Sequence, residues 1–291
     1  MKTVYLCEHD AILKEYLLEI GLSRHYCKKV KLYGKMYIND VEAKNYFPLK
    51  KGDKITIELD EELNQEVVPL IDTKLDIRYE DDFLLVINKP VNLATLPTKK
   101  HFYDNVISLV KKHYLDKGIN SNIHVVNRLD YSTSGLMVIA KDGLTHYLLT
   151  PKDEKVIKRK YKALVCGKMD KKSGVIDLPI SRIPGSMKRE VSENGKDAQT
   201  IYHVEKEYLD KSLVDIELVT GRTHQIRVHF SYLGYPLIGD KLYNENYNNE
   251  ERLCLHCYYV SFIHPHTKEQ ITIIDDSDVF NLGWKKFINN V

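Results

Sequence analysis

The amino-acid sequence predicts an α+β protein, with a small N-terminal domain followed by a larger one. Apolar residues recur at helical spacing near residues 12–20, 106–114 and 223–233, and short apolar runs bounded by Gly, Pro, Asn or Asp lie between these stretches. A chain of 291 residues can bury a sizeable core, although its length alone also allows a single compact fold. The expected division of the chain is residues 1–60, a linker at 61–74, and residues 75–291.

The first domain is expected to contain two helices and then short strands over residues 11–59. Ser23 suits the N-cap of the second helix, and turns at Asn39-Asp40 and Gly52-Asp53 separate the strands. Between residues 24 and 54, nine Lys or Arg side chains stand against three acidic ones, a local charge of +6. Such a patch suits a phosphate backbone, and a solvated lysine face is the alternative interpretation.

The second domain is expected to begin after an aperiodic stretch that is acidic at first and contains Pro69. Residues 77–79 and 83–87 have the pattern of strands, and residues 106–114 have that of an amphipathic helix. Lys89 ends the second of these strands, either as a solvated side chain or as a phosphate contact.

A short polar loop between two apolar segments holds the residues best suited to chemistry. Residues 123–126 and 136–140 are predicted strands, and Asp130 lies between them. An aspartate that acts as a nucleophile must stay ionised while partly shielded from water, so it needs a nearby cation. Arg128 is the local candidate. For an Arg-x-Asp sequence taken alone, a structural ion pair is the alternative.

The rest of the chain adds three further elements. A basic stretch over residues 152–172, with nine basic and three acidic side chains, contains a predicted strand with Tyr161. Residues 180–199 are polar and aperiodic, which predicts a surface excursion, and a predicted strand follows at 213–219. A helix is expected from about Thr223, with one apolar stripe that consists of Ile226, Phe230 and Leu233, before Gly234.

Composition narrows the classes of function. A net charge of +2 does not by itself indicate a nucleic-acid binder. Five scattered cysteines argue against a disulfide scaffold, and the single CxxC at Cys254 and Cys257 lacks the second ligand pair of a zinc site. The sequence shows no signal peptide, membrane span, GxGxxG or P-loop, so we expect a cytoplasmic protein without a nucleotide cofactor or a metal.

Two stretches resemble the signatures of the RluA family of RNA pseudouridine synthases. The first is Arg128-Leu129-Asp130 with Thr133-Ser134-Gly135, and Asn127 stands where His is more usual. The second is TGRTHQIRVH, residues 220–229. The resemblance covers roughly residues 75–280, and it implies the pseudouridine synthase fold, a mixed, mostly antiparallel central sheet with flanking helices.

The same resemblance implies roles for individual residues. Asp130 would attack either the ribose or the uracil ring, Tyr161 would stack on the uracil and help to remove the carbon 5 proton, and Arg227 would hold Asp130 ionised through a bidentate contact. Arg227 paired with an unrelated carboxylate is the alternative. Arg128 would fill the space that a flipped uridine vacates. The expected RNA-binding residues are Arg128, Asn127, Lys89, Arg222, Arg24 and Lys28.

Residues 11–59 also resemble the S4-like RNA-binding module. Asp40 departs from the glycine usual at its position; the residues that match are Ser23, Arg24, Lys28, Gly34, Asn39, Gly52 and Asp53. The module favours large-subunit ribosomal RNA over transfer RNA as the substrate. Two other classes of function are a noncatalytic RNA-binding or ribosome-assembly factor, and a metal-dependent hydrolase that a chelator would inactivate.

Overall fold

The computed structural model describes residues 2–20, 22, 27, 30–31, 34–59, 74–151, 156–246, 252–275 and 284. The chain divides into two compact units, Met1–Asp72 with Leu96–Ser108, and Thr73–Thr95 with Leu109–Val291. The predicted linker, except for Lys74, lies outside the described residues. So do Ser23, Arg24 and Lys28 of the predicted second helix.

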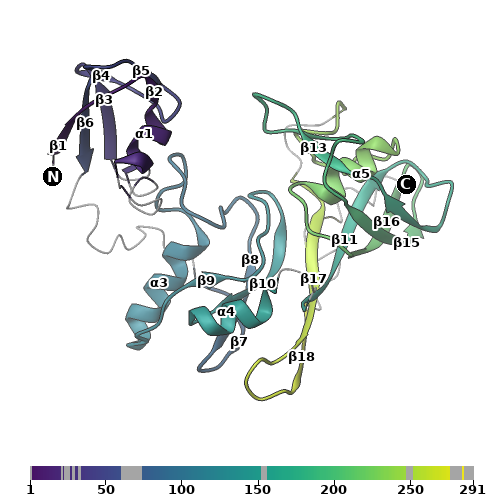
Figure 1. The fold of residues 1–291 in the computed structure, drawn as a ribbon. Coiled ribbons are helices and arrows are strands. Elements are labelled where there is room, and N and C mark those ends of the chain that lie inside the picture. Colours follow the sequence, from purple (N-terminus) through teal and green to yellow (C-terminus); the bar gives the residue numbers. More distant parts are fainter. Residues whose placement is uncertain are drawn as a thin grey trace. The chain divides into compact units, whose positions relative to one another are not determined.

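The N-terminal unit contains a four-stranded antiparallel sheet in the order β1-β6-β3-β4, a small β2-β5 pair and the short helix α1 (Figure 1). Asn39 and Asp40 both have positive φ, 49° and 68°, as a two-residue turn between β3 and β4 requires. The Asn39 side chain also donates to Asp53 Oδ1 (2.8 Å) and accepts from Lys54 N–H (2.9 Å). The elements are β1 (Lys2–Leu6), β2 (Ala11–Ile12), α1 (Leu13–Glu19), β3 (Gly34–Ile38), β4 (Val41–Glu42), β5 (Pro48–Leu49) and β6 (Lys54–Leu59).

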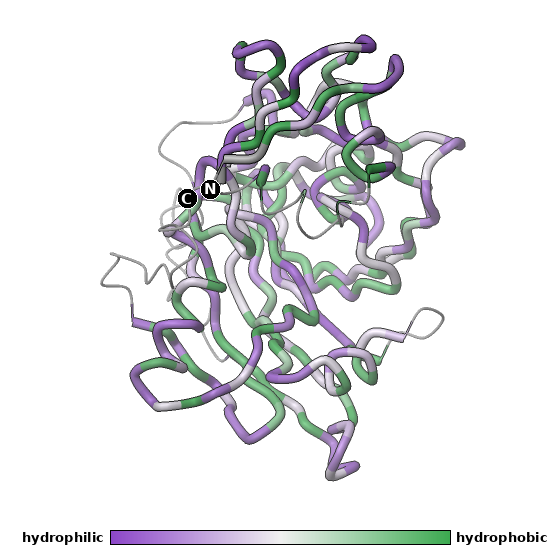
Figure 2. The backbone as a smooth tube through the Cα atoms, turned by 60° about the vertical axis from the view of Figure 1, so that its left-hand side comes forward, coloured by the Kyte–Doolittle hydropathy of each residue, from purple (hydrophilic) through white to green (hydrophobic). Residues whose placement is uncertain are grey.

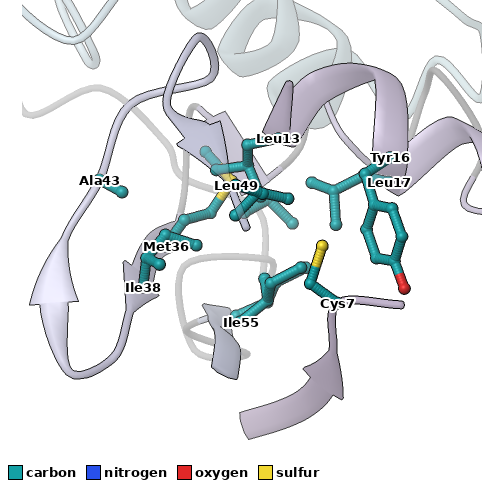
Figure 3. Packing of buried hydrophobic residues seen from close by; sticks show 11 residues of the cluster. Cys7, Leu13, Tyr16, Leu17, Met36, Ile38, Ala43, Leu49 and Ile55 are labelled. Atoms are coloured by element: carbon teal, nitrogen blue, oxygen red, sulfur yellow. The ribbon is translucent and has the colours of Figure 1, made fainter. Parts of the chain in front are cut away.

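One face of this sheet and the helix α1 enclose the core of the N-terminal unit (Figure 3). Leu13 and Leu17 of α1 pack with apolar side chains from the strands, and Leu13 and Ile55 are fully buried. Tyr16 places its ring at the edge of the cluster, where its hydroxyl donates to the Leu6 carbonyl oxygen (2.9 Å). The predicted helical spacing of residues 12–20 therefore serves a buried face.

The second unit is built on a ten-stranded sheet with the main order β12-β15-β16-β11-β17-β10-β8-β7, to which β18 and β9 add at β17 and β10. All of its strand pairs are antiparallel except the parallel pair of β10 and β17. This confirms the predicted α+β class with a mixed, mostly antiparallel sheet. The strands are β7 (Ile77–Glu80), β8 (Leu84–Lys89), β9 (His124–Val125), β10 (Ser134–Ala140), β11 (Lys158–Cys166), β12 (Ser173–Asp177), β15 (Gln199–Glu207), β16 (Lys211–Leu218), β17 (Leu255–Ile263) and β18 (Gln270–Ile274).

The strand β10 lies at the centre of this sheet, and every one of its seven residues is buried. Gly135 at its start has φ 119°, and a Cβ atom there would lie 2.3 Å from the Cys257 carbonyl oxygen of β17. Only glycine allows two strands to approach so closely with this backbone conformation. Figure 2 shows that hydrophobic and hydrophilic stretches alternate along the backbone.

Helices and one hairpin complete the second unit. The predicted helix near residues 106–114 is α3 (Val106–Lys117), which belongs to this unit from Leu109 onward, and α4 spans Gly143–Leu149. Asp142 caps α4 by accepting from Thr145 N–H (2.8 Å). Within the polar stretch 180–199, the short strands β13 (Ile180–Arg182) and β14 (Arg189–Val191) pair as a hairpin, an element that the sequence did not predict. Among the described residues, no helix is long and apolar enough to cross a membrane.

Candidate active site

The loop with Asp130 is fixed by hydrogen bonds on both sides. Asn127 Oδ1 accepts from Val138 N–H (2.7 Å), and Asn127 Nδ2 donates to the Leu136 carbonyl (3.3 Å), so this side chain ties the loop to β10. Thr95 Oγ1 donates to the Leu129 carbonyl (2.7 Å). Because its backbone neighbours are held in this way, Asp130 has a defined position, and its side chain is 30% exposed.

The prediction that Asn127 binds substrate is therefore wrong for this structure. Its side chain is 5% exposed, and both its oxygen and its nitrogen are engaged by strand backbone. A buried amide satisfies its polar groups internally, and here that need gives Asn127 a structural role.

Lys89 is likewise not available as a phosphate contact. Its side chain is fully buried, and Nζ donates to the carbonyl oxygens of Pro90 (2.8 Å), Leu93 (2.9 Å) and Tyr131 (3.3 Å). Burial lowers its pKa to about 7, while the charge of Asp130 opposes that shift. Because an ammonium has three N–H groups, these carbonyls use its whole donor capacity. Through its hydrogen bond to the Tyr131 carbonyl oxygen, Lys89 links the residue after Asp130 to the end of β8.

Arg227 reaches Asp130 from the helix α5 (Gln225–Tyr232). Its Nη1 lies 3.5 Å from Asp130 Oδ2, and its side chain is 5% exposed. The bidentate contact, however, is made with Asp240, where Nε and Nη2 donate to Oδ2 (2.8 Å) and Oδ1 (2.6 Å). Burial lowers the pKa of Arg227, but the hydrogen bonds and charge of Asp240 outweigh burial and raise it overall. A permanently charged guanidinium thus bridges a fully buried carboxylate and a partly exposed one.

Asp240 was not singled out as a site residue from the sequence, because its partner lies thirteen positions earlier on another element. Gly239 precedes it with φ 72°, and a Cβ atom at Gly239 would lie 2.0 Å from the Arg252 carbonyl oxygen. The turn that follows lets the N–H groups of Leu242 (3.0 Å) and Tyr243 (3.2 Å) donate to Asp240 Oδ1. The Gly-Asp pair was the only local signal for this anchor.

His224 is a second residue that the sequence reasoning placed in a signature without a role. Its Nε2 lies 3.8 Å from Asp130 Oδ2, and its Nδ1 lies 2.8 Å from the Tyr243 hydroxyl oxygen. Burial lowers the pKa of His224, while Asp130 opposes and Arg227 adds to that effect. Arg227 Nη1 and His224 Nε2 therefore both approach the same carboxylate oxygen, Asp130 Oδ2.

Arg128 does not form the ion pair with Asp130 that its sequence position suggested. Its side chain is exposed, and in the described part of the chain the ion pairs of Asp130 run to Arg227 and His224. Closeness in sequence therefore does not identify the partners of Asp130, which come from the segment at residues 224–227. Arg222 is also exposed, and its Nε donates to the Asp197 carbonyl oxygen (2.8 Å).

Tyr161 lies on β11, opposite Cys257 of the neighbouring strand β17. Its side chain is 4% exposed, and its hydroxyl donates to the Cys257 sulfur. Burial is the main cause of a strongly raised pKa for Tyr161, to which the nearby charge of Asp130 contributes in the same direction. On the same strand, Arg159 has a buried Nε without a hydrogen-bond partner. The tyrosine is a neutral phenol in the wall of the site.

A buried polar chain holds the C-terminal end of the Asp130 loop. Arg252 Nη2 donates to Ser134 Oγ (3.0 Å), Ser134 Oγ and His256 Nδ1 lie 2.8 Å apart, and His256 Nε2 lies 2.9 Å from Asp275 Oδ2. Many hydrolases use a Ser, a His and an Asp for catalysis. Here Ser134 and His256 are buried, at 4% and 1% exposed. His256 is thus a packed strand residue, and these hydrogen-bonded side chains join β10 to β17.

The described residues hold no group of three or more His, Cys, Asp or Glu side chains that could bind a metal ion. Cys254 and Cys257 of the CxxC are both buried at the start of β17. Burial raises the pKa of Cys257 to about 12, which disfavours the thiolate that metals bind.

Comparisons with known proteins agree with this geometry. The family model described as RNA pseudouridylate synthase matches residues 83–232, the stretch that contains Asp130, Tyr161 and Arg227. The chain is 38% identical over 262 residues to the Bacillus subtilis (strain 168) protein named uncharacterized RNA pseudouridine synthase YjbO, covering 89% of this chain and 93% of that protein. It is 35% identical to Vibrio cholerae ribosomal large subunit pseudouridine synthase D, over 86% of this chain and 82% of that protein.

A solved structure, human RNA pseudouridylate synthase domain containing 1, aligns with a TM-score of 0.56 at 26% identity, over 71% of this chain and 84% of that chain. The sequence matches and the shared fold indicate the same family. The chain belongs to the RNA pseudouridylate synthase family, and it is an isomerase of that family.

Proposed function

We propose that this protein converts specific uridines of a structured RNA to pseudouridine with Asp130 as the reacting carboxylate. The observation that carries the proposal is the setting of Asp130: 30% exposed, on a fixed loop, with the Arg227 guanidinium 3.5 Å from Oδ2. The buried guanidinium, which keeps its proton, places a permanent positive charge beside this carboxylate. One oxygen is held, and the exposed part of the side chain faces outward to substrate.

The reaction breaks the bond between ribose carbon 1′ and N1 of the uracil, rotates the base, and forms a bond from carbon 1′ to carbon 5. N1 gains a proton and carbon 5 loses one, so no oxidant or external group is required. A base stacked in RNA has to be turned out before a side chain can reach its glycosidic bond. Arg128 is exposed beside Asp130 in sequence, and we assign it to the space that the base leaves. Attack on the ribose and attack on the ring are both compatible with this arrangement.

We assign Tyr161 to packing against the uracil, and not to proton abstraction from carbon 5. Its hydroxyl already donates to Cys257, and burial raises its pKa far above the usual value for tyrosine. A phenol in that state is a poor proton acceptor, because acceptance of a proton would require prior ionisation in a buried site.

For the substrate we propose large-subunit ribosomal RNA, bound in part by an S4-like N-terminal module. Relatives of this chain named ribosomal large subunit pseudouridine synthase D support the choice. In the N-terminal unit, Lys44, Lys50 and Lys51 are exposed, and Tyr46 is 75% exposed. Exposed cations with an aromatic ring suit a nucleic-acid backbone and an unstacked base. Arg24 and Lys28, which lie outside the described residues, and the cytoplasmic location stay predictions.

The test uses the full-length protein and RNA labelled with tritium at carbon 5 of uridine. Large-subunit ribosomal RNA that lacks modifications and a pool of unmodified transfer RNA are incubated separately, and label released to water is counted. Release from ribosomal RNA, followed by mapping to one or a few positions, supports the proposal. Release from transfer RNA alone overturns the proposed substrate, and no release from either RNA overturns the proposed activity.

A further inference from the structure

His224 occupies a backbone conformation that side chains other than glycine seldom adopt. It lies immediately before α5 with φ 60° and ψ 19°, in the left-handed region. Such a conformation in a folded protein is a recognised mark of a functional position, because the surrounding structure must impose it. Here the turn brings the imidazole to the carboxylate of Asp130, at 3.8 Å between Nε2 and Oδ2.

The hydrogen bonds around Tyr243 define which nitrogen of His224 carries the proton. The Tyr243 oxygen accepts from Arg189 N–H at 2.8 Å, and the same hydroxyl lies 2.8 Å from His224 Nδ1. We assign the hydroxyl hydrogen of Tyr243 to Nδ1, so that the phenol donates to the ring while it accepts from Arg189 N–H. A neutral imidazole has one N–H, so that hydrogen is placed on Nε2, the nitrogen that faces Asp130.

Burial favours the neutral form of the His224 ring. Burial is the main reason that the pKa of His224 is lowered, and positive charges at Arg227 and Arg189 add to it against the carboxylates. The side chain is 13% exposed, so water screens these charges little. The titratable and charged groups that face the ring are Asp130, Arg227, Asp240, Arg189 and Tyr243.

We propose that His224 is a positioning residue for the reaction, one that uses its Nε2–H to hold Oδ2 of Asp130 together with Arg227 Nη1. Both nitrogens have their closest approach at this oxygen, so Oδ1 is the oxygen presented to the uridine. A second donor 3.8 Å from Oδ2, beside the guanidinium at 3.5 Å, restricts the rotation of the carboxylate more than the guanidinium does alone. The inference rests on the proposed role of Asp130 and adds to it the group that orients the attack.

Two substitutions of His224 test the roles of Nδ1 and Nε2 separately. His224→Asn suits the left-handed backbone, and its Oδ1 accepts from Tyr243 in place of Nδ1, but it has no donor that reaches Asp130. His224→Gln extends an N–H to the place of Nε2. His203→Asn is the matched control, because it makes the same His-to-Asn change at an exposed position of β15.

Single-turnover label release and RNA binding are measured for all variants, with thermal unfolding as a check on folding. We expect His224→Asn to lower kcat roughly 10- to 100-fold while KM for RNA changes less than about 2-fold, and His224→Gln to recover much of the loss. His203→Asn should match the wild type. A wild-type kcat for His224→Asn, or equally low kcat for the Asn and Gln variants, overturns the inference.

If His224→Asn fails to fold, His224→Gly replaces it, because glycine accepts the same φ, and imidazole is added to the assay. Turnover restored by imidazole supports a role for the ring, and no restoration contradicts it. These outcomes are distinct from failure of the proposed function, in which the wild-type protein itself releases no label.

Discussion

The buried pair of Arg227 and Asp240 gives a prediction whose size follows from the structure. Both side chains are almost completely buried, at 5% and 0% exposed. Three N–H groups converge on Asp240 Oδ1, from Arg227, Leu242 and Tyr243, so Asp240→Asn must keep its oxygen there and set its amide nitrogen against Arg227 Nε–H. The variant thus leaves a buried guanidinium without its carboxylate and places two donors face to face.

Removal of one partner from a buried ion pair costs about 3–5 kcal/mol of unfolding free energy. Domains of about 150–250 residues lose roughly 2–4 °C in Tm per kcal/mol, so the expected fall in Tm is roughly 6–20 °C. Arg227 also loses the anchor that sets its distance to Asp130, and a misplaced contact of this kind lowers kcat by roughly 100-fold. Differential scanning calorimetry and single-turnover label release measure the two effects.

The matched control is Asp76→Asn. Asp76 makes the same bidentate contact with Arg78, at 2.9 Å and 3.0 Å, but its side chain is 50% exposed. Exposed pairs contribute at most about 1 kcal/mol, so this variant should change Tm by only a few degrees. Equal Tm values for Asp240→Asn and Asp76→Asn would refute the argument that burial makes the Arg227–Asp240 pair important.

Two further predictions concern the residues that fix the Asp130 loop. Because burial lowers the pKa of Lys89 to about 7, the folded state binds fewer protons than the unfolded state between pH 7 and the ordinary lysine pKa, and this contribution to stability grows as pH rises through that window. Urea unfolding at pH 7 and pH 9 measures this contribution. Between these pH values the wild-type protein should gain unfolding free energy relative to Lys89→Met, by up to about 1.4 kcal/mol per pH unit. The same free-energy difference between the two proteins at both pH values would contradict the prediction. Gly135→Ala should cost more than about 3 kcal/mol, since its Cβ would lie 2.3 Å from the Cys257 carbonyl oxygen at φ 119°. Gly118→Ala, with φ 66° and nothing within 4 Å, bears only the backbone strain of about 1–2 kcal/mol and serves as its control in the same urea assay.

Helices and strands whose residues follow a clear local pattern could be predicted from the sequence. The buried strand β10 contains the apolar run at residues 136–140, and α3 follows helical spacing. The hairpin of β13 and β14 was missed because each strand has only three residues, too few to establish an alternation. The parallel contact of β10 with β17 joins residues more than one hundred positions apart, which no local pattern encodes.

The site was predictable where a motif carries the residue, and less so where its partner comes from elsewhere in the chain. Asp130 and Arg227 approach to 3.5 Å, but the bidentate contact that the resemblance implied for this pair is made between Arg227 and Asp240. Lys89 was misread because three carbonyls converge on it only after folding, two of them close in sequence and one from Tyr131. Likewise, His224 was predicted within the helix, whereas α5 begins at Gln225 and a left-handed turn directs the imidazole to Asp130.

The most direct measurement is the comparison of wild-type protein with Asp130→Asn in single-turnover tritium release, at RNA concentrations where both are fully bound. Asn has nearly the same shape and leaves the loop hydrogen bonds of Asn127 and Thr95 intact, since these involve other atoms. We expect unchanged RNA affinity and no detectable label release from the variant. Turnover by Asp130→Asn at a rate near that of the wild type would show that another group performs the reaction.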